Sequence, residues 1–208
     1  MADYKGVFIA IEGGDGAGKS TQARLLASRL REAGHEVVLT YEPGDTRIGP
    51  TVRRLVLDVA SEGLDPRAEA LLYAADRAEH VAALIRPALE RGAVVITDRY
   101  IDSSIAYQGV GRGLGVAEVA AVSAFATGGL LPDLTVVLDV PEDVRRPRIA
   151  GLGDRLEREA AEFHETVRKA YLHRAAADPG RYLVLDASQP PDQLADLIAE
   201  QVEKVMST

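Results

Sequence analysis

Short runs of apolar, mostly β-branched residues recur along the chain and alternate with longer segments whose apolar residues lie three and four positions apart. Such alternation is typical of a parallel β-sheet covered by helices. The runs are apolar at successive positions, as expected of strands that are buried on both faces. We therefore predict an α/β fold, with strands at 7–11, 37–40, 94–97, 135–140 and 182–185.

The longest helical pattern covers residues 66–91. Its apolar residues step by four and three along one stripe, which serves either the core or the packing of two subunits. The stripe consists of Leu71, Ala75, Ala78, Ala82, Ile85 and Leu89.

The periodic pattern fails between residues 141 and 157, where arginines accumulate around Pro147. This segment also contains Gly151 and Gly153, which are candidate hinge points. We interpret it as a mobile excursion from the sheet and helices.

Composition narrows the class of protein. A chain of 208 residues suits one compact domain with excursions, and its net charge of -8 opposes nonspecific binding to nucleic acid or to an anionic membrane. The chain has no cysteine, which excludes disulfides and thiolate metal sites. The apolar run near the N-terminus is too short for a signal peptide or a membrane span, so we expect a cytoplasmic protein.

The stretch EGGDGAGKST, residues 12–21, contains the pattern G-x-x-x-x-G-K-[ST] between a predicted strand and a predicted helix. Glycines allow successive backbone N–H groups to face one phosphate, and the helix N-terminus adds its dipole. Lys19 is expected to reach the β- and γ-phosphates of a nucleoside triphosphate, and Ser20 to bind Mg²⁺. The phosphate-binding residues predicted from this loop are Gly13, Gly14, Asp15, Gly16, Ala17, Gly18, Lys19, Ser20 and Thr21.

Further candidate residues follow the third predicted strand, at an edge of the sheet where open parallel sheets bind ligands. Asp98 can hold the water shell of a metal, and Arg99 can bind a phosphoryl oxygen. Asp15 repels phosphates and should point away from them, towards a second substrate. If the next residues are helical, Ser104, Tyr107 and Gln108 share one face.

The chain resembles the bacterial thymidylate kinases in the segments EGGDGAGKST, EPGDT, YAADRAEHV, DRYIDSSIAYQG and PDLTVVLDV, followed by an arginine-rich stretch that ends in DRLE. The resemblance covers nearly the whole chain and implies one domain, residues 1–208, with the P-loop nucleoside monophosphate kinase fold. That fold has a five-stranded parallel sheet with helices on both faces and a short mobile lid, here 141–157. The resemblance also implies transfer of the γ-phosphoryl of ATP to dTMP, giving dTDP and ADP for dTTP synthesis, with Mg²⁺ and as a homodimer.

In that family Arg99 would hold the dTMP phosphate, Asp15 would face the sugar 3′-hydroxyl, and Tyr107 would crowd the ribose 2′ position. Tyr73 would stack on thymine and Arg77 would meet its carbonyl; the alternative is a core tyrosine with a surface arginine paired to Asp76 or Glu79. The dTMP-binding residues so implied are Asp15, Glu42, Pro43, Tyr73, Arg77, Arg99, Ser103, Ser104, Tyr107 and Gln108.

Some members of the family place an arginine in the phosphate loop, and others use arginines of the lid. Because this chain has Gly16 at the loop position, the lid-arginine type is implied, with the lid excluding water when it closes. The lid arginines are Arg145, Arg146, Arg148 and Arg155. The catalytic residues implied are Lys19, Arg99, Asp15, Arg148 and Arg155.

Departures in two segments leave alternatives open. The lid contains Pro147, and Ile149 and Ala150 precede Gly151 where arginine is common in the family. Where the family commonly has R-E-P-G-G-T, this chain has Tyr41 in place of the arginine and Asp45 in place of the second glycine, which adds a negative charge beside an anionic site. A kinase for another nucleoside monophosphate and a catalytically impaired relative remain possible. A GTPase is disfavoured, because its N-K-x-D motif needs an asparagine and the chain contains none.

Overall fold

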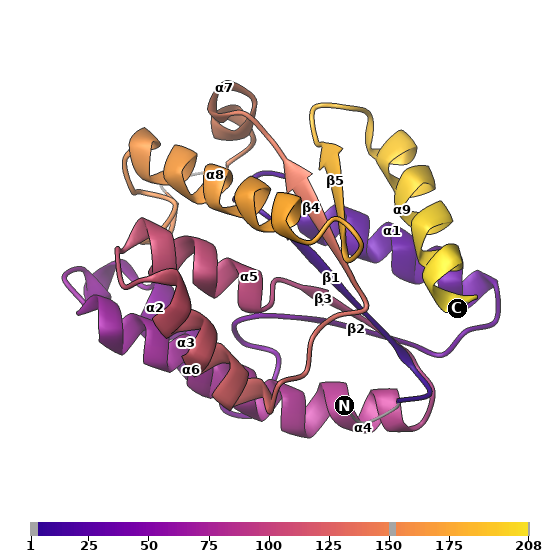
Figure 1. Ribbon diagram of the computed structural model, residues 1–208. Coiled ribbons are helices and arrows are strands. Elements are labelled where there is room, and N and C mark those ends of the chain that lie inside the picture. The colour runs from indigo at the N-terminus through magenta and orange to yellow at the C-terminus, as the bar shows by residue number, and fades with distance from the viewer. Residues whose placement is uncertain (1–3, 150–152, 208) are drawn as a thin grey trace.

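The predicted strands form one sheet of five parallel strands in the order β2-β3-β1-β4-β5 (Figure 1). The computed structural model describes residues 4–149 and 153–207. Every predicted run is confirmed as a strand, with ends that differ by at most two residues. The strands are β1 Val7–Gly13, β2 Val37–Tyr41, β3 Val94–Asp98, β4 Leu134–Asp139 and β5 Tyr182–Asp186.

The register places the functional segments at one edge of the sheet. Ile11 of β1 pairs with Asp98 at the end of β3, and Tyr41 of β2 also pairs with Asp98. The loops that follow these three strands therefore begin at the same height. This is the edge at which parallel sheets bind ligands.

Helices cover both faces of the sheet (Figure 1). The helices α1 and α9 pack on one face, while α4, α5 and α8 pack on the other and α2, α3 and α6 lie farther out. Alternate residues of β1 enter the two cores: Ile9 and Ile11 face α1, and Phe8 packs with Ile85 and Leu89. The helices are α1 Lys19–Glu32, α2 Gly49–Leu57, α3 Pro66–His80, α4 Arg86–Glu90, α5 Ile101–Ser104, α6 Val116–Thr127, α7 Glu142–Arg145, α8 Ala161–Ala177 and α9 Pro191–Met206.

The long predicted helix is interrupted by a π-helical segment, η2 Val81–Ile85, between α3 and α4. Pro87 lies one residue beyond α4's start and has no N–H for the regular helical bond, which the wider turn accommodates. The predicted stripe is only partly a core face. Leu71, Ala75 and Ala82 are exposed, and Ile85 and Leu89 are buried.

A second π-helical segment, η3 Ile105–Gly111, continues α5 and carries Tyr107 and Gln108, whereas Ser104 is the last residue of α5. A short 3₁₀ helix, η1 Val59–Ser61, follows α2. The π-helical segments η2 and η3 cannot be recognised from the spacing of apolar residues, because each alters only a short part of its helix.

The excursion from residue 141 begins with α7 and the 3₁₀ turn η4 Arg146–Arg148. Its middle, including the proposed hinge at Gly151, lies outside the described residues. Its last part lies against α2, because the backbone N–H of Arg155 donates to the Leu57 carbonyl at 3.1 Å.

Candidate active site

The phosphate loop curls tightly between β1 and α1. Gly13 has φ +136°, and a β-carbon there would come within 2.5 Å of the Leu138 carbonyl oxygen. Gly16 has φ +76°, and a β-carbon there would meet the Arg145 carbonyl oxygen at 2.9 Å. Both positions therefore require glycine, and an arginine at position 16 would collide with α7.

Lys19 and Ser20 open α1 directly below this loop. The Lys19 ammonium donates to the Gly14 carbonyl at 2.8 Å, and burial lowers the pKa of Lys19. A lysine held in this way gains from an anionic ligand, which would compensate the cost of burying its charge. A cavity of about 970 Å³ lies in front of both residues and reaches Tyr41, Asp98 and Arg148.

Ser20 and Asp98 supply the oxygen ligands that Mg²⁺ prefers. The Ser20 hydroxyl donates to the Asp98 carboxylate at 2.5 Å. The two oxygen ligands therefore lie together beside the phosphate loop. Among the described residues there is no cluster of three or more His, Cys, Asp or Glu that could cage a metal. A Mg²⁺ ion there would take its other ligands from water and from bound phosphates, which is usual for this ion.

Arg99 follows β3 in a left-handed backbone conformation, with φ +74°. Few residues other than glycine adopt this conformation, and it is held here by hydrogen bonds. The Arg99 N–H donates to the Ile11 carbonyl at 3.0 Å, and the Thr97 hydroxyl donates to the Arg99 carbonyl at 2.9 Å. The turn directs the guanidinium under the phosphate loop, where it contacts the Gly13 carbonyl at 3.3 Å and the Ser103 hydroxyl at 3.1 Å.

Asp15 forms an ion pair with Arg99 and accepts a hydrogen bond from the Tyr107 hydroxyl at 3.0 Å. Burial opposes its ionisation, but the charges of Arg99 and Lys19 outweigh burial and lower the pKa of Asp15 below its usual range. Asp15 is therefore a carboxylate at neutral pH. Its side chain turns towards Arg99 and Tyr107 and lines both the large cavity and a second one beside it.

A second cavity, of about 130 Å³, adjoins the first, and both are lined by Asp15 and Arg99. The structure brings most of the predicted dTMP-binding residues together in its wall. Those residues are Asp15, Glu42, Pro43, Tyr73, Arg99, Ser103, Ser104, Tyr107 and Gln108. The wall also contains Arg53 and Leu57, which no sequence motif indicated, and three residues of the DRLE segment that were not predicted to line this site: Asp154, Leu156 and Glu157.

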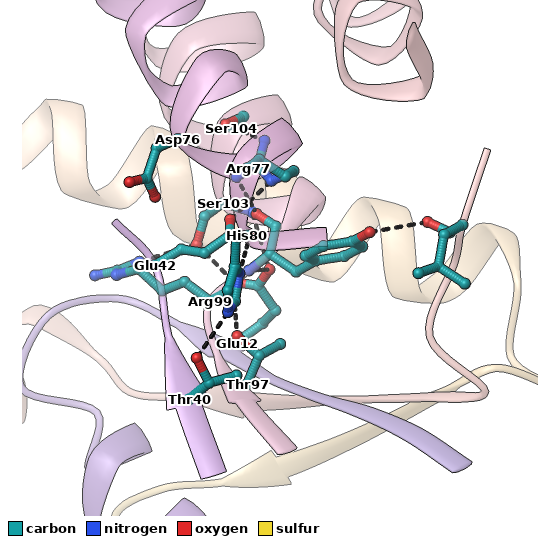
Figure 2. Close-up of polar contacts among 12 residues, drawn as sticks. Glu12, Thr40, Glu42, Asp76, Arg77, His80, Thr97, Arg99, Ser103 and Ser104 are labelled. Atoms are coloured by element: carbon teal, nitrogen blue, oxygen red, sulfur yellow. Dashed lines mark hydrogen bonds and ion pairs between the residues drawn. The ribbon is translucent and has the colours of Figure 1, made fainter. Parts of the chain in front are cut away.

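Arg77 lies behind this wall with only 1% of its surface exposed. It donates to Glu42 at 2.7 Å, to the Ser104 hydroxyl at 3.0 Å and to the Tyr100 carbonyl at 2.9 Å. A surface arginine paired with Asp76 or Glu79 is therefore not what the structure contains. Figure 2 shows Arg77 at the centre of these contacts.

Glu69, at the start of α3, orients another residue of the wall. Its carboxylate is fully buried and accepts from the Gln108 amide at 2.7 Å. The amide nitrogen of Gln108 is thereby engaged, which leaves its carbonyl oxygen as the group that can accept from a ligand.

The four lid arginines occupy different places. Arg146 and Arg148 are both exposed. Arg148 lines the large cavity and donates to the Ala187 carbonyl at 3.0 Å. Arg145 pairs with Glu142 at 2.6 Å and packs beside the phosphate loop.

The resemblance implies that Arg155 faces the phosphates, but its side chain lies against α2 and α3 instead. Its guanidinium pairs with Glu69 at 2.5 Å and donates to the Val56 carbonyl at 2.8 Å. The fully buried Glu69 carboxylate needs a cation, and Arg155 supplies it together with Arg112.

Glu12 is a site residue that sequence analysis missed. It is fully buried below Arg99 and accepts hydrogen bonds from Tyr100 N, Ser103 N, the Ser103 hydroxyl and the Tyr171 hydroxyl, at 2.6 to 3.1 Å. Burial, with a smaller contribution from Asp102, raises the pKa of Glu12 to about 7. Glu12 therefore anchors the turn that carries Arg99, at the cost of burying an acid.

We expect this cost to show in the pH dependence of stability. Because the folded pKa of Glu12 lies above the unfolded value, the folded state holds its proton more tightly, and this group's contribution falls as pH rises from about 4.5 to about 7. Because an amide does not titrate, the stability of Glu12→Gln should fall by about 2 kcal/mol less over this pH range. The amide oxygen can still accept hydrogen bonds from the two backbone N–H groups. Urea unfolding at pH 5 and pH 8 measures this difference, and an equal pH slope in both proteins would contradict the assignment.

This architecture is that of a P-loop nucleoside monophosphate kinase. It combines the sheet order and the phosphate loop with Asp98 and Arg99 at the same edge of the sheet and a second, adjoining cavity. Comparisons with known proteins narrow the class. The profile of the thymidylate kinase family matches residues 11–198. The chain belongs to the thymidylate kinase family.

Individual relatives support this family assignment. A thymidylate kinase of Clavibacter michiganensis subsp. michiganensis is 52% identical over 205 residues, 97% of each chain. One from Thermomicrobium roseum is 50% identical and covers 96% of this chain and 95% of its own. The crystal structure of thymidylate kinase from Ehrlichia chaffeensis superposes with a TM-score of 0.75 at 34% identity, over 97% of this chain and 98% of that one. Within the described part of the chain, no helix is long and apolar enough to cross a membrane.

Proposed function

We propose that this chain transfers the γ-phosphoryl group of ATP to dTMP, giving dTDP and ADP. The observation that carries the proposal is the meeting of two cavities at Asp15 and Arg99. The larger cavity offers the phosphate loop and Lys19 to a triphosphate. The smaller one offers an aromatic ring and a few polar groups to a nucleoside monophosphate.

The reaction needs positioning and charge stabilisation more than acid or base chemistry, because the attacking oxygen of dTMP is already ionised. The backbone N–H groups of the loop and Lys19 hold the β- and γ-phosphates. Arg99 lies where the two substrates meet and would bind oxygens of both phosphate groups. Ser20 and, through water, Asp98 would hold Mg²⁺, which when bound neutralises charge on the phosphate oxygens.

Arg148 is the lid arginine best placed to join this group, because it lines the wall of the large cavity. Arg145 would support the loop from α7. Arg155 would instead hold the end of the lid in place, because it pairs with Glu69 of α3 and its backbone N–H bonds to Leu57 of α2.

The base would lie against Tyr73 in the smaller cavity. The free carbonyl oxygen of Gln108 suits the N3–H group of thymine, whereas cytosine presents an acceptor at the same position. Arg77 lies behind the wall and donates to Glu42 and Ser104, which line the cavity, so it would orient the groups that meet a thymine carbonyl. Tyr107 is held by Asp15 and would crowd a ribose 2′-hydroxyl.

Arg77→Ala is expected to raise KM for dTMP about 30-fold, since hydrogen bonds to charged groups are lost, and to leave KM for ATP within about twofold. Steady-state kinetics with each substrate varied measures both constants. Arg67→Ala, an exposed arginine on the same helix, is the matched control. Equal increases for dTMP and ATP would contradict the role of Arg77 at the base.

The test of the function is ADP production with Mg²⁺-ATP and, in parallel, dTMP, dUMP, UMP, CMP, AMP or GMP, with Lys19→Ala protein as the blank. A preference for dTMP that vanishes in the blank supports the proposal. Activity with another monophosphate would overturn the base site but keep the phosphate site. ATP binding without turnover would identify a catalytically impaired relative.

We propose further that the protein is a homodimer joined through α2, α3 and α6, which lie together away from α1 and α9 (Figure 1). These helices expose large apolar side chains: Leu55, Leu71, Val116 and Phe125, of which Phe125 is 91% exposed. Sedimentation that shows only monomer at micromolar concentration would contradict this. A cytoplasmic location fits the substrates, because ATP and dTMP carry several charges and are retained inside the cell.

A further inference from the structure

A chain of four polar side chains runs from the second cavity to the loop after β2. Its centre is His80, the last residue of α3, which is 1% exposed. His80 Nδ1 lies 2.8 Å from Glu42 Oε1, and His80 Nε2 lies 2.7 Å from Thr40 Oγ1. The Thr40 hydroxyl lies 2.7 Å from Asp45 Oδ2. Figure 2 shows His80 between Glu42 and Thr40.

These three contacts require three protons, because each hydrogen bond contains one. The Thr40 hydroxyl has one proton, and a neutral imidazole has one. If both carboxyl groups are ionised and the imidazole is neutral, one contact is therefore left with facing lone pairs. A third proton must reside on His80, on Glu42 or on Asp45.

The other groups around the chain decide where that proton resides. The second oxygen of Glu42 accepts from Arg77 Nε at 2.7 Å, so a guanidinium lies against the negative charge of this carboxylate. Asp45 is only half-buried, so water can solvate the charge of its carboxylate.

Charge balance points the same way. The charged groups facing His80 are Glu42 and Asp45 from the segment after β2, and Asp76 and Arg77 from α3 itself. Burial raises the pKa of Asp76 to about 6, so it too is ionised at pH 7.5. Three carboxylates against one guanidinium leave an excess of negative charge, which a second cation in their midst reduces.

We propose that His80 is a doubly protonated imidazolium held between Glu42 and Asp45, and that it is a positioning residue for the base end of the second cavity. Its Nδ1–H fixes one oxygen of Glu42, so that the other oxygen stays on Arg77, beside Ser104 and Tyr73. The inference rests on the proposed dTMP site. It also gives Asp45 a role: its carboxylate binds Thr40, outside the residues that line the second cavity.

The protonation state can be measured directly by ¹⁵N NMR of the imidazole nitrogens at pH 7.5. The chain has four histidines, so a His80→Gln spectrum assigns the signal, and the exposed His35 and His173 serve as internal references. We expect both nitrogens of His80 to carry protons. A single protonated nitrogen in the unaltered protein would overturn the proposal.

Asp45→Gly is the matched variant, because it restores the residue common in the family at this position and frees the Thr40 hydroxyl to donate to His80 Nε2. We expect His80 in this variant to carry one proton at pH 7.5. A doubly protonated His80 in both proteins would overturn the role of Asp45. This arm needs no kinetics.

Kinetics test the positioning role. His80→Gln should raise KM for dTMP about tenfold, with kcat and KM for ATP within about twofold. In Asp45→Gly, KM for dTMP should match the unaltered protein at pH 6 and exceed it about threefold at pH 8.5, because only neutral imidazole weakens the hold on Glu42. Unchanged KM for dTMP in both variants would overturn the positioning role. Failure of the base site itself would appear separately, in Arg77→Ala and in the substrate panel.

Discussion

Replacing Lys19 by alanine is expected to lower kcat about 10³-fold, because the ammonium faces the oxygens on which charge develops during phosphoryl transfer. Its position is set by α1, which begins at Lys19, and by the bond to the Gly14 carbonyl. Folding should not suffer. Burial lowers the pKa of Lys19, which means that the charged form is costly in the folded protein without ligand.

The two expectations separate function from structure. Initial rates of ADP formation measure kcat, and thermal unfolding without nucleotide measures stability, where the alanine protein should be at least as stable. Lys204→Ala, at an exposed lysine of α9 that pairs with Glu200, is the control and should leave kcat unchanged and lower stability by about 0.5 kcal/mol at most. A kcat within tenfold of the unaltered protein would show that Lys19 does not act on the transferred group.

The sheet and the phosphate loop could be predicted because both are encoded locally. Buried strands leave runs of β-branched residues, and the loop needs glycine at fixed positions, such as Gly13 against the Leu138 carbonyl. The family motif likewise indicated most of the second cavity. Each of these signals lies within about 12 neighbouring residues, so the remainder of the chain is not needed to recognise it.

Contacts between distant segments could not be predicted in this way. Glu69 and Arg155 are separated by 86 positions, and their ion pair turns a residue expected at the phosphates towards α3. Glu12 precedes the phosphate loop and looks like part of it, yet it supports Arg99 from below. Buried acids take their partners from any element that packs nearby, so sequence spacing carries no signal for them.

Replacing Arg99 by lysine is the second large effect that we expect, with kcat/KM for dTMP lowered about 10²- to 10³-fold. Lysine keeps the positive charge beside Asp15 but loses the planar fork of donors, in which one nitrogen contacts Gly13 and Ser103 and the other contacts Asp15. The loss should fall on dTMP and on kcat, while KM for ATP stays within about threefold, because the phosphate loop still binds the triphosphate. Initial rates with each substrate varied measure these constants.

Arg99→Ala should be slower still, but it also leaves the half-buried carboxylate of Asp15 without its cation, at a cost of about 2 kcal/mol in stability. The low pKa of Asp15 means that this contribution is present at neutral pH and is lost only in strong acid, so unfolding at pH 7.5 will report it. The double variant Asp15→Asn with Arg99→Ala removes both charges and should recover most of that stability. If the kcat of the double variant stays as low as that of Arg99→Ala, Arg99 acts on the phosphoryl group being transferred and not through the ion pair. Recovery of kcat would mean that Arg99 serves chiefly to neutralise Asp15.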